Sequence, residues 1–86
     1  QLTVYPNPST TNVIVSYEIN NAGNASFYLY DLTGKIVSSI NQKYNTGTNR
    51  TYVETKSLAS GTYILNIVLT SQNGEQYFES KKISIN

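Results

Sequence analysis

The chain has 86 residues with a net charge of +1, and it contains neither Cys nor His. This length suits one domain, and the two missing residue types exclude disulfides, zinc sites built on thiolate or imidazole, and Ser-His or Cys-His catalysis. The near-neutral charge argues against a nucleic-acid binder, which needs a basic patch. We therefore expect residues 1–86 to be a single non-catalytic domain with no metal and no other cofactor.

The polar composition indicates an exported protein. The charged fraction is 13%, against about 25% in an average domain, and the remaining polar residues are mainly Ser, Thr and Asn. No apolar run approaches the ~20 residues that cross a membrane, so we expect no membrane insertion. Gln1 and Leu2 lead straight into an apparent strand without a signal peptide, so we interpret the chain as the end of a longer exported protein.

Apolar and polar residues alternate with period two along the chain, which predicts β-strands. The first strand is Leu2–Tyr5, and it stops at Pro6-Asn7-Pro8 because proline donates no ladder hydrogen bond. The second is Asn12–Ile19, and the third covers residues 25–31. In the second strand, one face carries Val13, Val15, Tyr17 and Ile19. In the third, Phe27 and Leu29 share one face, and Tyr28 and Tyr30 share the other.

A tight turn is predicted at residues 31–35, where Gly34 supplies a positive φ and Asp31 accepts hydrogen bonds from turn N–H groups. We prefer this structural role of Asp31 to calcium binding, because one acid is a poor start on six to eight ligands. The hairpin partner is residues 36–40. Residues 41–49 are expected to form a polar loop.

The second half of the chain predicts three further strands. Residues 50–55 form the fifth strand with Tyr52 as its core anchor, residues 56–60 are a connection closed by Gly61, and residues 62–70 form the longest apolar strand, anchored by Tyr63. After a turn at residues 71–74, residues 75–85 complete the fold, with Tyr77, Ile83 and Ile85 facing inward. Seven short strands predict an all-β, immunoglobulin-like antiparallel β-sandwich, and a small closed barrel is the alternative.

Few residues suggest chemistry. The acids lie on different predicted strands and turns and form no catalytic pair; they are Glu18, Asp31, Glu54, Glu75 and Glu79. Tyr28 and Tyr30 share a strand face and form a candidate platform for sugar rings, although packing against the core or over a sheet edge explains them as well. Lys81 and Lys82 fit a solvated strand edge that discourages pairing with other chains.

Four segments, in this order, resemble the type A C-terminal sorting domain of the type IX (Por) secretion system of Bacteroidetes. They are LTVYPNP at residues 2–8, LYDLTGKIV at 29–37, LASGTYIL at 58–65 and KKISI at 81–85. The structural residues of the motif are Asp31, Gly34, Lys35, Gly61 and Tyr63. Two departures are the Ser84-containing final strand, which stops at Asn86, and a generic polar hairpin at residues 71–74. If either feature matters for docking, this domain serves a translocon with different preferences.

The resemblance implies a non-catalytic secretion signal at the end of a secreted enzyme or adhesin. The passenger is covalently linked upstream and reaches the cell surface or medium through the periplasm. An outer-membrane translocon recognises the folded domain, and a sortase-like surface protease removes it. The candidate recognition residues are Pro6, Asn7, Pro8, Lys81, Lys82, Ile83, Ser84 and Ile85.

We expect the domain to be a monomer. Pro6 and Pro8 are expected to stiffen the entry to the domain and to separate the domain from the passenger. The final strand, with its free end, is the expected docking element, because such a strand can pair with a partner's sheet edge. Two alternatives remain open: a carbohydrate-binding module and a passive immunoglobulin-like spacer of a secreted enzyme or adhesin.

Overall fold

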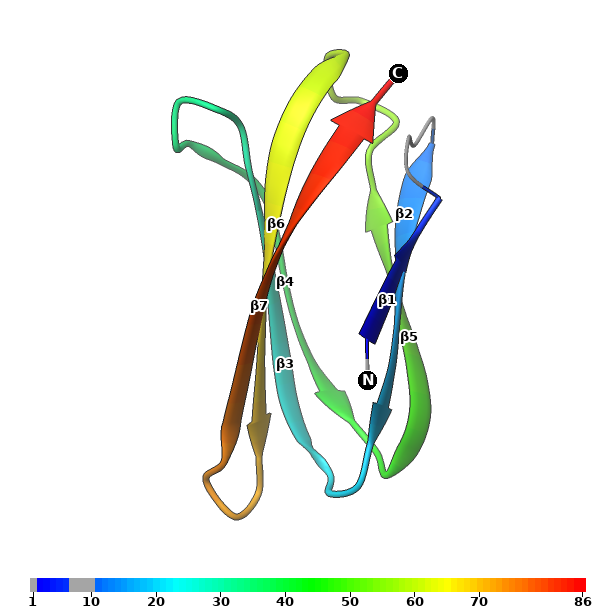
Figure 1. Ribbon diagram of the computed structural model, residues 1–86, viewed down its shortest axis with the longest axis vertical. Coiled ribbons are helices and arrows are strands. Elements are labelled where there is room, and N and C mark those ends of the chain that lie inside the picture. Colours follow the sequence, from blue (N-terminus) through cyan, green and yellow to red (C-terminus); the bar gives the residue numbers. More distant parts are fainter. Residues whose placement is uncertain (1, 7–10) are drawn as a thin grey trace.

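Because alternation gives each strand one apolar face, the strands can bury those faces only by packing as layers. The computed structural model describes residues 2–6 and 11–86, which form two antiparallel sheets facing one another (Figure 1). The three-stranded sheet has the order β1-β2-β5 and contains β1 (Leu2–Tyr5), β2 (Asn12–Ile19) and β5 (Gly47–Glu54). The four-stranded sheet has the order β4-β3-β6-β7 and contains β3 (Gly23–Tyr30), β4 (Ile36–Tyr44), β6 (Gly61–Ser71) and β7 (Gln76–Ile85).

The predicted seven-stranded sandwich is confirmed, and the closed barrel is wrong because the two sheets remain separate. The first, second and fifth strands share one sheet and the third, sixth and seventh share the other, as in immunoglobulin constant domains. The fourth strand differs from that arrangement, since it joins the larger sheet beside β3.

The core lies between the two sheets and is built by every second residue of the strands. Its fully buried members include Val13, Val15, Tyr17, Phe27, Leu29, Leu65, Ile67 and Ile83. The Tyr17 ring lies at the centre, tilted against Phe27 at 6.1 Å and edge-on to Tyr44 at 5.8 Å between ring centroids. These aromatic contacts join the two sheets, because Tyr17 belongs to β2 while the other two rings belong to β3 and β4.

One polar contact also joins the sheets. The Gln42 amide of β4 donates to the Thr51 hydroxyl of β5 at 2.6 Å, and the Tyr17 hydroxyl lies 3.3 Å from the same oxygen. Thr51 is 3% exposed, so its hydroxyl would be costly to bury without these partners. The contact therefore satisfies the polar groups that β4 and β5 carry into the sandwich.

Two predictions about the strands are wrong. Residues 41–49 are not a loop, since β4 runs to Tyr44 and β5 begins at Gly47. The extension of β4 was hidden because its outward residues are polar and one of its inward residues is Gln42. Tyr52 is 60% exposed, because its neighbours Thr51 and Val53 are buried and successive side chains of a strand point to opposite faces.

Tyr77, which was expected to face inward, is 46% exposed. It does lie on the inner side of β7, opposite the buried Leu69 of β6. However, β7 is an edge strand of its sheet and β1 is an edge strand of the other, so Tyr77 lies where the sandwich opens to solvent. The edges formed by β1 and β7 therefore frame one open side of the molecule.

Candidate recognition surfaces

The turn that connects β3 and β4 is organised by one carboxylate. The Asp31 Oδ1 atom accepts hydrogen bonds from the Thr33 backbone N–H at 2.9 Å, the Thr33 hydroxyl at 2.6 Å and the Lys35 N–H at 3.1 Å. Gly34 has φ of 90°, a conformation that other residues adopt only with strain, and its N–H donates to the Asp31 carbonyl at 3.1 Å. These contacts give the motif residues Asp31, Gly34 and Lys35 a structural role.

Hydrogen bonding also changes the acidity of this turn. The hydroxyl of Thr33, followed by the backbone N–H of Lys35, lowers the pKa of Asp31. Both donors favour the ionised carboxylate, which accepts hydrogen bonds but donates none. In the described part of the chain, no group of three or more Asp and Glu side chains is placed to hold a metal ion. The carboxylate of Asp31 therefore serves to fix the turn.

The motif segment at residues 58–65 fixes the connection before β6. The Tyr63 hydroxyl donates to the Ala59 carbonyl at 2.7 Å, while its ring is only 7% exposed. Gly61 has φ of 151° at the point where the connection becomes strand. Tyr63 is thus a core residue whose hydroxyl also holds the preceding loop.

The side chains of the final motif segment, residues 81–85, lie on two different sides of β7. Ile83 and Ile85 are 1% and 3% exposed and belong to the core, whereas Lys82 and Ser84 lie on the outer face of β7. Lys82 is opposite Ile64 and Ser84 is opposite Thr62 on the neighbouring strand β6. A partner can contact the outward side chains of this segment, and also that of Lys81, without opening the sandwich.

Lys81 lies on the opposite side of β7 from Lys82. Its ammonium group is 2.8 Å from a Glu79 carboxylate oxygen, and the other oxygen of Glu79 accepts a hydrogen bond from the Tyr77 hydroxyl. The Lys81 contact, followed by the Tyr77 hydroxyl, lowers the pKa of Glu79, and the same hydrogen bond raises the pKa of Tyr77. The two lysines therefore do not form one basic patch. Charged side chains on the inner side of an edge strand discourage pairing with other chains. The alternating sequence of β7 already indicates that Lys81 and Lys82 lie on opposite sides.

The other candidate segment begins at Pro6, which is exposed and follows β1 directly. Asn7 and Pro8 lie outside the described residues. Because β1 belongs to the three-stranded sheet, Pro6 lies between two strands of the domain and does not separate the domain from a passenger, contrary to our expectation. The structure places Pro6 after one edge strand of the open side and the final segment on the other edge strand.

The exposed aromatic residues are not those that the sequence indicated. Tyr28 and Tyr30 are half-buried on the outer face of the central strand β3. On the other sheet, Tyr5 and Tyr52 are 37% and 60% exposed and flank Ile14 in one row across β1, β2 and β5. A flat ligand therefore finds accessible ring surface in this row as well as on Phe78, which is 64% exposed on the outer face of β7. The sequence pattern did not reveal this row because strand pairing brings it together.

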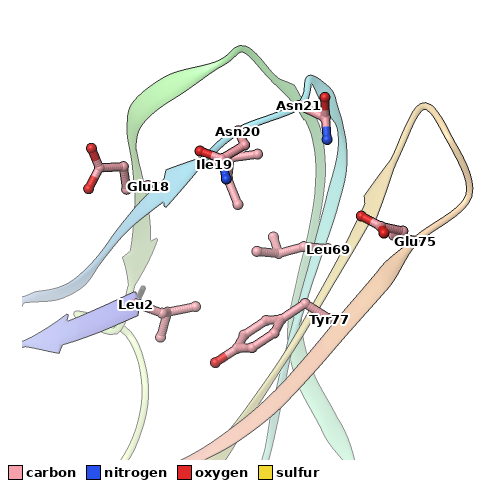
Figure 2. A pocket seen from close by; sticks show the side chains of 8 residues that line it. All are labelled: Leu2, Glu18, Ile19, Asn20, Asn21, Leu69, Glu75 and Tyr77. Atoms are coloured by element: carbon pink, nitrogen blue, oxygen red, sulfur yellow. The ribbon is translucent and has the colours of Figure 1, made fainter.

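A pocket of about 240 Å³ opens at one end of the sandwich (Figure 2). Its apolar lining consists of Leu2, Ile19, Leu69 and Tyr77, and its polar lining consists of Glu18, Asn20, Asn21 and Glu75. Figure 2 shows the side chains of Leu2, Leu69 and Tyr77 directed toward one another, while the Glu18 carboxylate points away. The pocket thus joins the start of β1 to the start of β7. No local pattern in the sequence indicated this pocket, because its lining comes from four separate segments.

Comparisons with known proteins agree with this architecture. The family model described as "Secretion system C-terminal sorting domain" matches residues 3–86. No curated protein matches the chain in sequence. The crystal structure of CopC from Methylosinus trichosporium OB3b is similar with a TM-score of 0.67 and 14% identity, covering 100% of this chain and 94% of that chain. At this identity the similarity shows the fold alone. The described residues contain no helix that is long and apolar enough to cross a membrane.

Proposed function

Because the chain belongs to the family of secretion system C-terminal sorting domains of type IX, we propose that it is the folded signal that an outer-membrane translocon reads to deliver a passenger to the cell surface or medium. The passenger is linked upstream and arrives through the periplasm, and a sortase-like surface protease removes the domain. The family is non-catalytic, and we extend this to the chain. The observation that carries the proposal is the family match from residue 3 to residue 86, which spans both sheets.

The packing supports a signal that is read in its folded form. A domain that follows varied passengers needs a core of its own, and the two sheets supply one. The turn around Asp31 and the loop held by Tyr63 are each fixed by hydrogen bonds within the domain. Their shape is therefore independent of the passenger.

The outer face of β7 is our candidate for the docking surface. Lys82 and Ser84 lie on this face, opposite residues of β6, while Ile83 and Ile85 pack into the core and hold β7 in place. Docking through these outward side chains leaves the fold intact, whereas pairing through a released final strand would expose two buried isoleucines. Pro6 follows β1, whose edge frames the open side of the sandwich together with β7. Pro6, Asn7 and Pro8 are therefore a second candidate for the docking surface.

The test is a fusion of a signal peptide, a reporter enzyme and residues 1–86, expressed in a type IX-competent cell. We expect reporter activity outside the cell, and retention in the periplasm would reject the proposal. Lys82→Asp should reduce export at least several-fold. Its matched control is Lys43→Asp, which makes the same charge change on the outer face of β4, the opposite edge of the same sheet. Equal effects of the two variants would reject β7 as the docking surface.

The alternatives make different predictions. A carbohydrate-binding module would be retarded on polysaccharide gels, and the structure directs that test to Tyr5 and Tyr52 as well as to Tyr28 and Tyr30. A passive spacer would leave export intact when the domain is deleted. Loss of export on deletion, without retardation on a wide panel of glycans, would support the sorting signal over both.

A further inference from the structure

The two hairpin turns of the four-stranded sheet, residues 31–35 and 71–75, have the same backbone structure. In both turns the N–H of the first residue donates to the carbonyl of the fifth, at 3.0 and 2.8 Å. The N–H of the fourth residue donates to the carbonyl of the first, at 3.1 and 3.0 Å. The fourth residue is Gly34 with φ of 90° in one turn and Gly74 with φ of 89° in the other. The two turns are therefore equivalent position by position.

The side chains of the two turns differ at the second and fifth positions. Leu32 stands where the other turn has Gln72, and Lys35 stands where it has Glu75. Leu32 is 71% exposed, the largest fraction among the exposed large apolar side chains of the described residues. Because the same backbone turn forms with Gln72, its geometry does not require an apolar side chain at this position. The side chain of Leu32 is thus free of a role in the turn and accessible to another molecule.

The turn that carries Leu32 is fixed before any partner arrives. One carboxylate oxygen of Asp31 accepts hydrogen bonds from the backbone N–H and the hydroxyl of Thr33 and from the N–H of Lys35. Figure 1 shows this turn projecting from the end of the sandwich that also holds the C-terminus. A side chain on a fixed turn loses little conformational entropy on binding, so more of its contact energy appears as affinity.

The same turn is continuous with the candidate docking surface on β7. Directly after the turn, Ile36 is 49% exposed and lies opposite Tyr30 of β3. Tyr30 lies opposite Ile64 of β6, and Ile64 lies opposite Lys82 of β7. These four residues form one row across the outer face of all four strands, which we call the Ile36–Lys82 row. Three strand spacings make it about 14 Å long, a length that suits contact with the surface of a folded partner.

The charges on this outer face are all positive. All four strands lie within the described residues, and their outward side chains include two lysines, Lys43 and Lys82, but no Asp or Glu. Lys43 lies at the far end of β4 from Ile36, outside the row. Lys82 lies in the row, and Lys35 lies in the adjoining turn. A complementary partner is therefore apolar opposite Leu32 and Ile36 and carries carboxylates opposite the lysines.

We propose that the turn at residues 31–35 and the Ile36–Lys82 row form one docking surface, and that Leu32 enters an apolar socket on an acidic surface of the partner protein. The inference rests on the proposed function and deepens it, because it states the chemistry of the partner and extends its contact from β7 across the sheet. Leu32 then marks one end of the contact and Lys82 the other. The core between the sheets is left undisturbed.

The first experiment introduces Leu32→Gln into the reporter fusion, giving this turn the residue found in the equivalent one. We expect export to fall about tenfold, the loss that follows when one leucine side chain is withheld from an apolar site. The thermal midpoint of residues 1–86 should stay within about 4 °C of the parent. The matched control combines Leu32→Gln with Gln72→Leu, which keeps the composition, and it should be exported as poorly. Normal export of either variant would overturn the inference.

A second variant guards against an effect on folding. Ile36→Thr changes an exposed position of the row to another β-branched residue, and it should lower export several-fold at an unchanged midpoint. If export of Leu32→Gln and Ile36→Thr fell only in proportion to a lower midpoint, the effect would be one of stability, and the inference would be overturned.

A competition assay measures docking directly. Residues 1–86 with a signal peptide and no passenger, coexpressed in excess, should reduce export of the parent fusion several-fold, whereas the Leu32→Gln form should not. Equal competition by the two forms would overturn the inference. A dimer of the purified chain that Leu32→Gln abolishes would assign the surface to a second copy and overturn it. Binding to vesicles of phosphatidylcholine and phosphatidylglycerol that Leu32→Gln abolishes would assign it to a lipid surface, with the same consequence.

The parent fusion separates this inference from the proposed function. Retention of the parent fusion in the periplasm would reject the proposed function and the inference with it. Export of the parent together with undiminished export of Leu32→Gln would reject the inference alone, and the sorting function would stand.

Discussion

Replacing Ile83 by Ala should reduce export by destabilising the domain, because this side chain belongs to the core even though it lies in the candidate docking segment. Ile83 is 1% exposed and faces Tyr63 across β6 and β7. Each of the three carbons that Ile83→Ala removes contributes about 0.8 kcal/mol to the free energy of unfolding, and with the cavity left behind the total loss of stability is about 3 kcal/mol. The whole domain is stable by only about 4–13 kcal/mol at typical values per residue, so this loss is a large fraction.

The assay pairs thermal unfolding, followed by circular dichroism on residues 1–86, with export of the reporter fusion. We expect Ile83→Ala to lower the midpoint by about 12–24 °C, and Ile83→Val to lower it by less than half as much. Lys82→Ser, a surface change in the same strand, should shift the midpoint by less than about 4 °C. Export loss in the isoleucine variants should follow the midpoint, whereas export loss in Lys82 variants should not.

The reasoning is refuted if Ile83→Ala unfolds at the same temperature as the parent, since a core position cannot lose that volume without effect. It is also refuted if Lys82→Ser destabilises the domain as much as Ile83→Ala, because the two sides of β7 would then be equivalent. Either result would remove the physical basis for dividing the final segment into core and docking residues.

Three other predictions test the packing and the edges. Gly23→Ala should cost about 3 kcal/mol in a urea titration, because its Cβ would lie 2.1 Å from a backbone oxygen of β6; an unchanged midpoint would contradict the close approach. Thr33→Ala should raise the pKa of Asp31 in an NMR titration. Because the pKa of Asp31 is lowered in the folded state, its stabilising contribution is present above the unfolded pKa and is lost as pH falls through the folded pKa. Thr33→Ala should therefore make stability depend less on pH in this acid range. An unchanged titration of Asp31 would reject the assigned hydrogen bond. Replacing Glu79 and Lys81 together by Val should promote self-association in analytical ultracentrifugation, and a strictly monomeric variant would show that these charges do not protect the edge.

Sequence reasoning was most reliable where alternation was strong and flanked by turn residues. Val13, Val15 and Tyr17 of β2 were correctly placed on one face of their strand, which the structure buries, because a strand buried on one face leaves a clear period. The Asp31 turn was also predicted correctly, since its geometry depends on contacts within a few residues.

The errors arose where tertiary contacts determine the outcome. Gln42 is polar, yet it faces inward because Thr51 and Tyr17 satisfy its amide, and no local pattern reveals partners so far along the chain. Tyr52 was placed in the core on residue type, although the phase set by its neighbours directs it outward. Tyr77 was given the correct side, but only the sheet order shows that this side is open at β7.

The candidate docking residues could be chosen from sequence only by resemblance. Their division into buried Ile83 and Ile85 and outward Lys82 and Ser84 needed the pairing of β6 with β7. The pocket was beyond sequence reasoning altogether, because the ends of both sheets form it jointly.

The burial of Ile83 and Ile85 in β7 has a consequence for protein synthesis. Because both side chains belong to the core between the two sheets, folding of the domain cannot be completed before β7 has left the ribosome. A product truncated before β7 would lack part of this core and present no folded signal.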